Sequence, residues 1–215
     1  MKTEEKRAQK DTAEEDGKKS AVRENVEAIL VAVLLALLIR TFIVQAFKIP
    51  SGSMIPTLRV GDHILVNKFV YGLDIPFLNI PVYPGDTPQR GDIIVFKYPE
   101  DPDKDFIKRV IGVGGDIVAM KGRDVYVNGH RMTEDYAIYQ ETRGRRGGMA
   151  PVKVPPGKLF VMGDNRDNSH DSRFWGFVDL QAVRGKAFII YWSWNSGAAS
   201  PLDYVRWGRL GDVLH

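Results

Sequence analysis

One apolar stretch near the N-terminus constrains the fold of this chain more than any other feature. Every residue from Ala28 to Ile39 is apolar, and the apolar character resumes at residues 42–44 after a short polar break. A membrane-spanning helix needs about 20 residues, so we predict a single transmembrane helix over residues 22–42. Arg23 and Arg40 then lie at its two ends, where long side chains reach water.

The residues on both sides of this stretch distinguish an uncleaved anchor from a cleaved export signal. A cleaved signal ends in a small-residue site of the A-x-A kind, whereas Phe42, Gln45 and Lys48 occupy the region where that site is expected. Residues 1–21 are almost entirely charged or polar, which predicts a disordered tail. Their basic residues place this tail in the cytoplasm, so residues 43–215 are expected across the membrane.

Composition excludes several classes of protein. The length of 215 residues allows one sizeable domain besides the anchor. A formal net charge of +3 from 30 basic and 27 acidic residues gives no reason to expect a nucleic-acid partner. The absence of cysteine excludes a disulfide scaffold, a thiolate zinc site and a cysteine nucleophile.

The chain beyond residue 42 predicts a mostly β domain. Short β-branched runs alternate there with Gly, Pro, Asp and Asn. Asn128-Gly129 marks a hairpin turn, and the polar residues 132–150, with the Arg- and Gly-rich stretch 143–148, predict an exposed loop within a variable insertion near 121–150. The predicted strands are His63–Val70, Asp92–Tyr98, Asp105–Ile111, Ile117–Met120, Asp124–Val127, Lys158–Met162 and Ala187–Trp192.

A serine-rich segment and a lysine about fifty residues later point to chemistry. Ser51-Gly52-Ser53 follows the apolar stretch closely, and Lys108 lies in the apolar run 106–111. A serine hydroxyl needs a base to become a strong nucleophile, and lysine serves only when its amine is neutral. Burial favours the neutral amine, and lowering the lysine pKa by three units costs roughly 4 kcal/mol. The alternative is that Lys108 faces solvent, as lysines on β edges commonly do.

The segment 163–173, GDNRDNSHDSR, is the third informative feature. Its turn formers and opposite charges fit a surface loop, an oxygen-ligand calcium site, or an Asp/Arg network that braces an active site. Arg166 and Arg173 would place cations among the calcium ligands, so the ion-pair network is the better interpretation.

Four segments together resemble the signature segments of bacterial type I signal peptidase. They are residues 49–58, 90–96, 106–109 and 163–173, in that order and after a predicted anchor. The resemblance implies a β-rich catalytic domain of the signal-peptidase type on the outer, periplasmic side of the bacterial cytoplasmic membrane. It implies a serine endopeptidase that removes signal peptides from exported preproteins after small residues, with no cofactor. The implied partners are signal peptides, the phospholipid bilayer and the protein-export channel.

The resemblance also assigns roles to individual residues. Ser53 matches the family nucleophile and Lys108 its general base, which gives a Ser/Lys dyad with an acyl-enzyme intermediate. Ser51 matches the residue whose hydroxyl joins the backbone N–H of Ser53 in the oxyanion hole. Ser169 matches the residue that hydrogen-bonds and orients the lysine, and Asp171 and Arg173 match its supporting ion pair.

Specificity for small side chains implies shallow apolar pockets, and an extended substrate is expected to pair with an exposed strand edge. The alternative for any of the pocket residues is ordinary core packing. The positions that match the pockets are Phe47, Ile49, Pro50, Met54, Leu58, Phe106 and Ile107.

Other functions fit the sequence less well. His170 beside Asp171 invites a Ser-His-Asp triad with Ser53, but adjacent loop residues usually point apart and no G-x-S-x-G turn is present. The isolated histidines and the absence of an H-E-x-x-H pattern predict no metal. Self-cleaving repressors use a related serine/lysine chemistry without an anchor, and a non-catalytic binding module would be expected to have lost Ser53 or Lys108.

Overall fold

The computed structural model describes residues 24–37, 39–40, 43–75, 80–83, 85–140 and 148–215. The chain divides into two compact units, Met1–Ile43 and Val44–His215. In the first unit, residues 24–37 form a helix whose large apolar side chains are exposed. Among the described residues, no helix is both long enough and apolar enough to cross a membrane. The predicted tail, residues 1–21, lies outside the described residues, and the predicted span over residues 22–42 stays a prediction.

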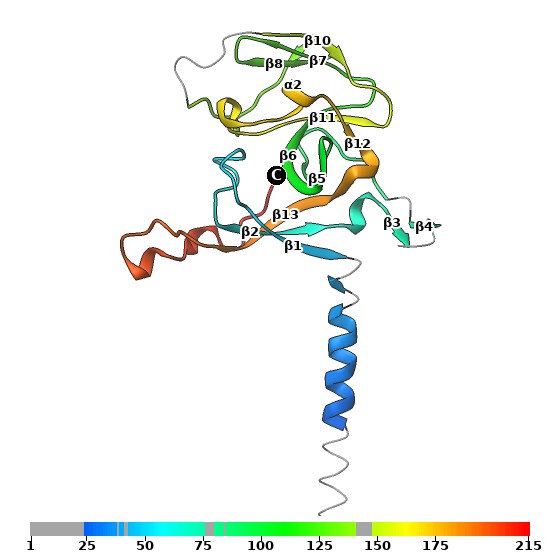
Figure 1. Ribbon diagram of the computed structural model, residues 1–215, viewed down its shortest axis with the longest axis vertical. Helices are drawn as coiled ribbons and strands as arrows, with labels where there is room; N and C mark the ends of the chain where they lie inside the picture. Colours follow the sequence, from blue (N-terminus) through cyan, green and yellow to red (C-terminus); the bar gives the residue numbers. More distant parts are fainter. Residues whose placement is uncertain (1–23, 38, 41–42, 76–79, 84, 141–147) are drawn as a thin grey trace, which may run out of the picture. The chain divides into compact units, whose positions relative to one another are not determined.

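A seven-stranded antiparallel sheet forms the centre of the second unit, which confirms the predicted mostly β class (Figure 1). Strands that are distant in sequence pair side by side, so the loops at one edge of the sheet come from separate parts of the chain. The strand order is β1 (Val44–Lys48), β2 (Asp62–Asn67), β13 (Val183–Ser193), β5 (Ile93–Tyr98), β6 (Asp101–Val113), β11 (Lys158–Met162) and β12 (Val178–Asp179).

Two smaller sheets and short helices complete the unit. Figure 1 shows the four-stranded sheet above the strands β6 and β11. It contains β10 (Met149–Lys153), β7 (Ile117–Lys121), β8 (Asp124–Val127) and β9 (His130–Arg131), and a separate pair contains β3 (Leu73–Ile75) and β4 (Ile80–Tyr83). The helices are α2 (Ser172–Trp175) and the 3₁₀ turns η1 (Phe69–Tyr71), η2 (Arg166–Asn168), η3 (Leu180–Ala182), η4 (Pro201–Asp203) and η5 (Trp207–Arg209).

Most predicted strands are confirmed, two of them with identical bounds, β8 and β11. The hairpin turn is also confirmed, because Asn128 and Gly129 both have the positive φ values, 54° and 83°, that a type I′ turn requires. The strand predicted to reach Val70 ends at Asn67 instead. Asn67 Oδ1 accepts the backbone N–H groups of Phe69 and Val70 at 2.9 and 3.2 Å, which starts η1 in place of a further strand pair.

Three larger differences from the predictions concern β6, β13 and β10. β6 begins at Asp101 and β13 at Val183, each four residues before the predicted start. Their early residues are mostly polar, and pairing with β5 rather than apolar character makes them strands. β10 occupies residues 149–153, partly inside the predicted loop 132–150, while residues 141–147 of that loop lie outside the described residues.

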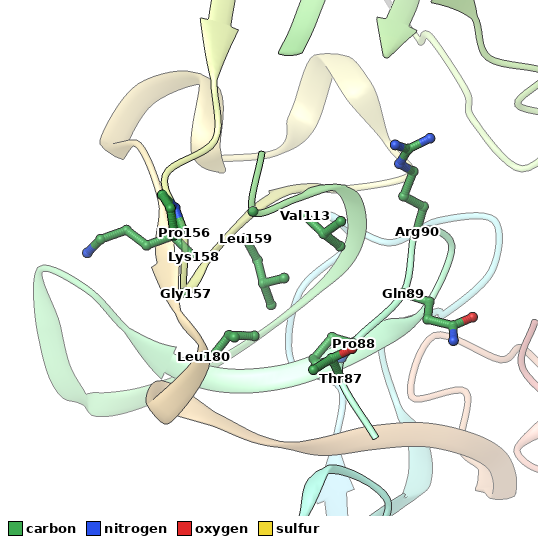
Figure 2. Close-up of a pocket in the computed structure, with 11 residues that line it drawn as sticks. Thr87, Pro88, Gln89, Arg90, Val113, Pro156, Gly157, Lys158, Leu159 and Leu180 are labelled. Atoms are coloured by element: carbon green, nitrogen blue, oxygen red, sulfur yellow. The ribbon is translucent and has the colours of Figure 1, made fainter. Parts of the chain in front are cut away.

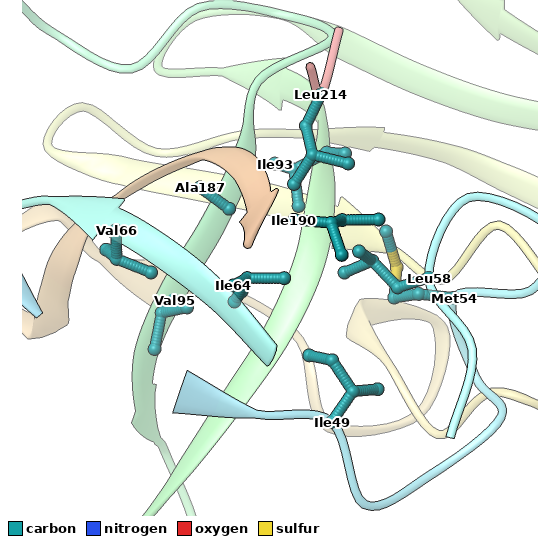
Figure 3. Close-up of a cluster of buried hydrophobic side chains, with 10 residues drawn as sticks. All are labelled: Ile49, Met54, Leu58, Ile64, Val66, Ile93, Val95, Ala187, Ile190 and Leu214. Atoms are coloured by element: carbon teal, nitrogen blue, oxygen red, sulfur yellow. The ribbon is translucent and has the colours of Figure 1, made fainter. Parts of the chain in front are cut away.

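Strand alternation divides the hydrophobic core into clusters on opposite faces of β5. Ile93 and Val95 lie in one cluster with Ile49, Met54 and Leu58 of the β1–β2 loop (Figure 3). Ile94 and Phe96 lie in another cluster, on the face covered by α2. Because both faces of β5 are buried, its sequence is almost continuously apolar. Each fully buried side chain of this size contributes about 1.5–3 kcal/mol.

The pairing of β6 changes along its length. Arg109 pairs with both β5 and β11, and residues 110–113 pair with β11, whereas residues 101–108 pair with β5 alone among the strands the structure describes. One edge of β6 is therefore open as far as Lys108. Among the strands the structure describes, β1 pairs only with β2, so β1 is an edge strand as well.

Candidate active site

The loop between β1 and β2 carries the predicted nucleophile, Ser53. Met54 and Leu58 are 1% and 0% exposed and pack in the core cluster of Figure 3. The backbone N–H of Leu58 donates to the Met54 carbonyl at 2.8 Å, which closes a turn between them. Because both apolar side chains are fixed in the core, the loop holds Ser53 in one place, at 8% exposure.

Lys108 lies on β6 and reaches this serine. Its Nζ donates to Ser53 Oγ at 2.8 Å and to the Ile107 carbonyl at 3.0 Å. Nζ also lies 5.5 Å from the centre of the Phe106 ring. Lys108 is only 4% exposed, which excludes the solvent-facing alternative. When the amine is neutral, its lone pair can accept the Ser53 proton across the same 2.8 Å.

Burial lowers the pKa of Lys108 from 10.5 to about 8, because desolvation disfavours the ammonium. The carboxylates of Asp171 and Asp164 act in the opposite direction, and Arg173 adds to the lowering. The net result is an amine that is neutral at mildly alkaline pH. A neutral amine beside a serine hydroxyl can work as a general base.

Ser51 lies close to the predicted nucleophile but is exposed. Its Oγ is 3.5 Å from Ser53 Oγ, so the two hydroxyls are neighbours with at most a weak hydrogen bond. The predicted role of Ser51 in an oxyanion hole stays a prediction.

Asp171 and Arg173 form an ion pair beside the site. Arg173 Nε and Nη2 donate to the two Asp171 oxygens at 2.7 and 2.8 Å. The same carboxylate accepts the backbone N–H of Arg173, as the N-cap of α2, and the backbone N–H of Gly163 at 3.0 Å. Because Asp171 is paired with an arginine, the 163–173 segment is an ion-pair network here and not a cluster of free carboxylates.

Ser169 differs from its prediction. Its side chain is buried, yet its Oγ makes no hydrogen bond to any described residue. The predicted bond to Lys108 is therefore absent, and Lys108 Nζ donates to Ser53 Oγ and to the Ile107 carbonyl. The role of Ser169 as a supporting residue stays a prediction.

Arg109, the residue after Lys108 on β6, forms a second buried ion pair with Asp164, which the sequence did not predict. Arg109 Nε and Nη2 donate to the Asp164 oxygens at 2.9 and 2.8 Å, and Thr57 Oγ1 donates to Asp164 at 2.5 Å. Thr57 belongs to the nucleophile loop and Arg109 follows Lys108 on β6. The pair therefore joins the two segments that carry the serine and the lysine. Arg109 and Asp164 lie in the segments 106–109 and 163–173, but nothing in their spacing indicated that they pair.

Asn165 was also missed, and it holds the backbone of the nucleophile. Its N–H donates to the Ser53 carbonyl at 3.0 Å, and its Nδ2 donates to the Gly52 carbonyl at 3.1 Å. Gly163 lies so close to the Ser53 carbonyl that a side chain at this position has no space. Only the Asp-Asn turn composition of the segment could have indicated such backbone contacts.

The predicted substrate-binding residues fall into two groups. Ile49, Met54 and Leu58 are buried in the core, as the core-packing alternative expects. The others keep accessible surface: Phe47, Phe106 and Ile107 are half-buried and Pro50 is exposed. A role in substrate binding stays a prediction for all seven.

His170 points to a different partner from the one a triad requires. It is exposed, its Nε2 lies 3.3 Å from Tyr98 Oη, and its ring lies 5.3 Å from that of Phe174. Ser53 is hydrogen-bonded to Lys108 instead. The structure therefore favours lysine over histidine as the base.

One open cleft lies away from this pair. It has a volume of about 530 Å³ and lies between the residues 87–90 that precede β5, the end of β6 at Val113, and the start of β11 (Figure 2). Neither Ser53 nor Lys108 lines it. The candidate site is instead the Ser53–Lys108 pair at the open edge of β6.

Known proteins are similar to this chain over most of its length. A sequence model of the family described as signal peptidase, peptidase S26, matches residues 22–192. Signal peptidase I of Pseudomonas aeruginosa is 40% identical over 218 residues, which cover 85% of this chain and 76% of that protein. Signal peptidase I of Aquifex aeolicus is 37% identical over 86% of this chain and 92% of that protein. A solved signal peptidase I from Enterococcus faecalis is 34% identical over 47% of this chain and 97% of that chain, with a TM-score of 0.41.

A serine hydroxyl hydrogen-bonded to a buried lysine amine, on an antiparallel β scaffold, is the arrangement of a serine hydrolase. The family match and the relatives narrow this class. The chain belongs to the signal peptidase family, peptidase S26, and is a serine peptidase of the bacterial type I signal peptidase kind.

The close packing at Gly163 generates a first prediction. A Cβ at this position would lie 2.5 Å from the Ser53 carbonyl oxygen and closer still to Ser169 Oγ. Gly163→Ala should displace the nucleophile loop and lower kcat/KM for a preprotein by at least about tenfold. Gly208→Ala is the matched control, because a Cβ there meets nothing within 4 Å. Equal kcat/KM values for the two folded variants would contradict this account.

The buried lysine generates a second prediction, about stability. Since its pKa falls from 10.5 in the unfolded chain to about 8 in the folded one, the native state bears the cost of a buried charge below pH 8. This cost, at most about 3 kcal/mol, declines between the two pKa values. Lys108→Met should therefore raise the unfolding free energy at neutral pH and lose that gain as the pH rises. Thermal unfolding across this range checks the trend, with exposed Lys97→Met as the control.

Proposed function

We propose that this protein is a membrane-bound endopeptidase that removes signal peptides from exported preproteins by acyl transfer, with Ser53 as nucleophile and Lys108 as general base. Similarity to signal peptidase I already supports signal-peptide removal as the activity. The single observation that carries the mechanism is the 2.8 Å hydrogen bond between Lys108 Nζ and Ser53 Oγ, made by two buried groups.

In the proposed reaction, Ser53 Oγ attacks the scissile carbonyl carbon while Lys108 Nζ takes the hydroxyl proton. The tetrahedral intermediate carries an oxyanion, which the Ser53 backbone N–H and the Ser51 hydroxyl stabilise. Collapse breaks the C–N bond, and the Lys108 ammonium gives its proton to the leaving amine. A water molecule, deprotonated by the same lysine, then hydrolyses the acyl-enzyme and restores Ser53.

The substrate is an extended peptide with small side chains at the first and third positions before the cut. The open edge of β6 supports this proposal, because residues 101–108 leave backbone groups available beside Lys108. A peptide that adds to this edge would place its scissile bond near Ser53. The half-buried Phe106, Ile107 and Phe47 then leave little room for large side chains, which favours A-x-A sites.

The proposal includes a membrane anchor and a defined topology. Its support is the apolar stretch Ala28–Ile39 and the exposed apolar side chains of the helix over residues 24–37, which a lipid environment would accommodate. The lysine and arginine residues within the segment 1–21 favour a cytoplasmic N-terminus. The catalytic domain is then on the outer side of the cytoplasmic membrane, where it meets the bilayer, the export channel and the emerging signal peptide.

The proposed dyad is tested by removing each member. Detergent-solubilised full-length protein should cleave a preprotein that bears an A-x-A site, and mass spectrometry should find the new N-terminus after the second small residue. Ser53→Ala and Lys108→Ala should each lower kcat by at least about a thousandfold, because the two residues act as a unit. Near-normal turnover by either folded variant would mean that another residue performs the chemistry.

The pH dependence of cleavage tests the base independently. The neutral fraction of Lys108 falls about tenfold for each pH unit below its pKa, which burial lowers to about 8. We therefore expect kcat/KM to rise steeply from acidic pH and to level off above about pH 8. A profile that is flat from acidic to alkaline pH would exclude Lys108 as the base.

A further inference from the structure

Residues 134–138, which follow β9, lie against the 163–173 segment without belonging to the seven-stranded sheet. The backbone N–H of Ile138 donates to the Asp164 carbonyl at 2.8 Å, and the N–H of Arg166 donates to the Ile138 carbonyl at 2.9 Å. These bonds make Ile138 and Asn165 partners in a parallel β-bridge. The 134–138 segment is therefore joined to the residue that holds the Ser53 carbonyl.

Glu134 fixes this segment to the loop through a buried ion pair. Its two oxygens accept from Arg166 Nη2 at 2.5 Å and Nη1 at 2.8 Å, while Arg166 Nε donates to the Gly163 carbonyl at 3.2 Å. The side chains of Arg166 and Glu134 are 0% and 8% exposed. A guanidinium buried so completely needs its carboxylate, since an unpaired charge there would be costly.

Tyr136 contacts the neighbour of the proposed base. The guanidinium carbon of Arg109 lies 3.9 Å from the centre of the Tyr136 ring, which is a close cation–π contact. The Tyr136 hydroxyl donates to Glu134 at 3.1 Å, so the ring is held in place by the same carboxylate. Tyr136 on one side and Asp164 on the other fix Arg109, the residue after Lys108.

The 134–138 segment thus contacts one residue that adjoins Ser53 and one that adjoins Lys108. Asn165 hydrogen-bonds to the Ser53 carbonyl, and Arg109 follows Lys108 on β6. We propose that residues 134–138 position the Ser53–Lys108 pair for the reaction, with Tyr136 and Glu134 as positioning residues. This inference rests on the proposed function of the pair.

Electrostatics provides a readout that a purely structural role would not change. The charged groups acting on Lys108 are Asp171 and Arg173 at α2 and Asp164 behind β6. Arg109 neutralises Asp164. If Arg109 moves when its aromatic cover is removed, the less compensated Asp164 stabilises the Lys108 ammonium more strongly. The acidic limb of the kcat/KM profile should then move to higher pH.

The test compares Tyr136→Ala, Tyr136→Phe and Asp135→Ala in the full-length protein in detergent, with rates expressed per folded enzyme. Tyr136→Ala should lower kcat on the order of tenfold with little change in KM. It should also move the acidic limb upward by about half a pH unit or more. Tyr136→Phe keeps the ring over Arg109 and should restore most of the activity and the limb. Asp135, exposed on the same segment, should tolerate alanine.

Several results would overturn the inference. One is a folded Tyr136→Ala variant with the kcat and acidic limb of the wild type; another is equal loss in Tyr136→Phe. If Tyr136→Ala does not fold, Glu134→Gln, which keeps the size of the side chain, must show the lower kcat and the shifted limb. Failure of both variants to fold would assign the segment to stability alone.

Ser53→Ala, measured alongside, distinguishes a failure of the proposed function from a failure of the positioning role alone. If Ser53→Ala cleaves as fast as the wild type, the proposed function is wrong and the inference falls with it. If Ser53→Ala is inactive while Tyr136→Ala matches the wild type, only the positioning role of the segment is wrong.

Discussion

A lysine amine held close to neutrality beside a serine hydroxyl is the constraint on which the rest of this structure depends. Burying Lys108 opposes folding by about 3 kcal/mol at neutral pH, against a typical net stability of only 5–15 kcal/mol. Apolar packing around the lysine and the serine loop offsets that cost. β5 is apolar on both faces, Trp175 of α2 packs against the cluster that contains Ile94 and Phe96, and Met54 and Leu58 fix the serine loop in the core.

The acidic residues near Lys108 show how the amine stays near neutrality in a site that also needs carboxylates. The carboxylate of Asp164 binds Thr57 of the nucleophile loop and that of Asp171 binds the backbone N–H of Gly163, but a free carboxylate would draw a proton onto the lysine. Each is therefore paired with an arginine, Asp164 with Arg109 and Asp171 with Arg173. The arginines keep the structural function of the carboxylates while reducing their field at Lys108. In this site the two ion pairs therefore surround the lysine without contacting its amine.

Sequence reasoning reached the parts of this site that depend on local pattern. The β-rich class, most strands and the Asn128-Gly129 turn follow from alternation and turn chemistry, and Ser53 and Lys108 stand in short motifs. Whether Lys108 is buried could not follow from alternation, because β6 becomes buried on both faces from that residue onward. The contacts between Arg109 and Asp164 and between Glu134 and Arg166 join residues 55 and 32 positions apart, so no local pattern contains them. Ser169 shows that a motif identifies a side chain without determining its hydrogen bonds.

The register of β6 explains why the base lies where it does. Arg109 is the first residue of this strand that pairs on both sides, with Ile93 of β5 and Met162 of β11. Lys108, one residue earlier, pairs with Ile94 alone. The part of the strand from Arg109 onward therefore lies in the core and carries the ion pair, whereas the part before it keeps an open edge. At the junction a lysine can be desolvated by the core on one side and still be reached by a peptide carbonyl on the other, and a shift of the junction by one residue would lose one of the two conditions.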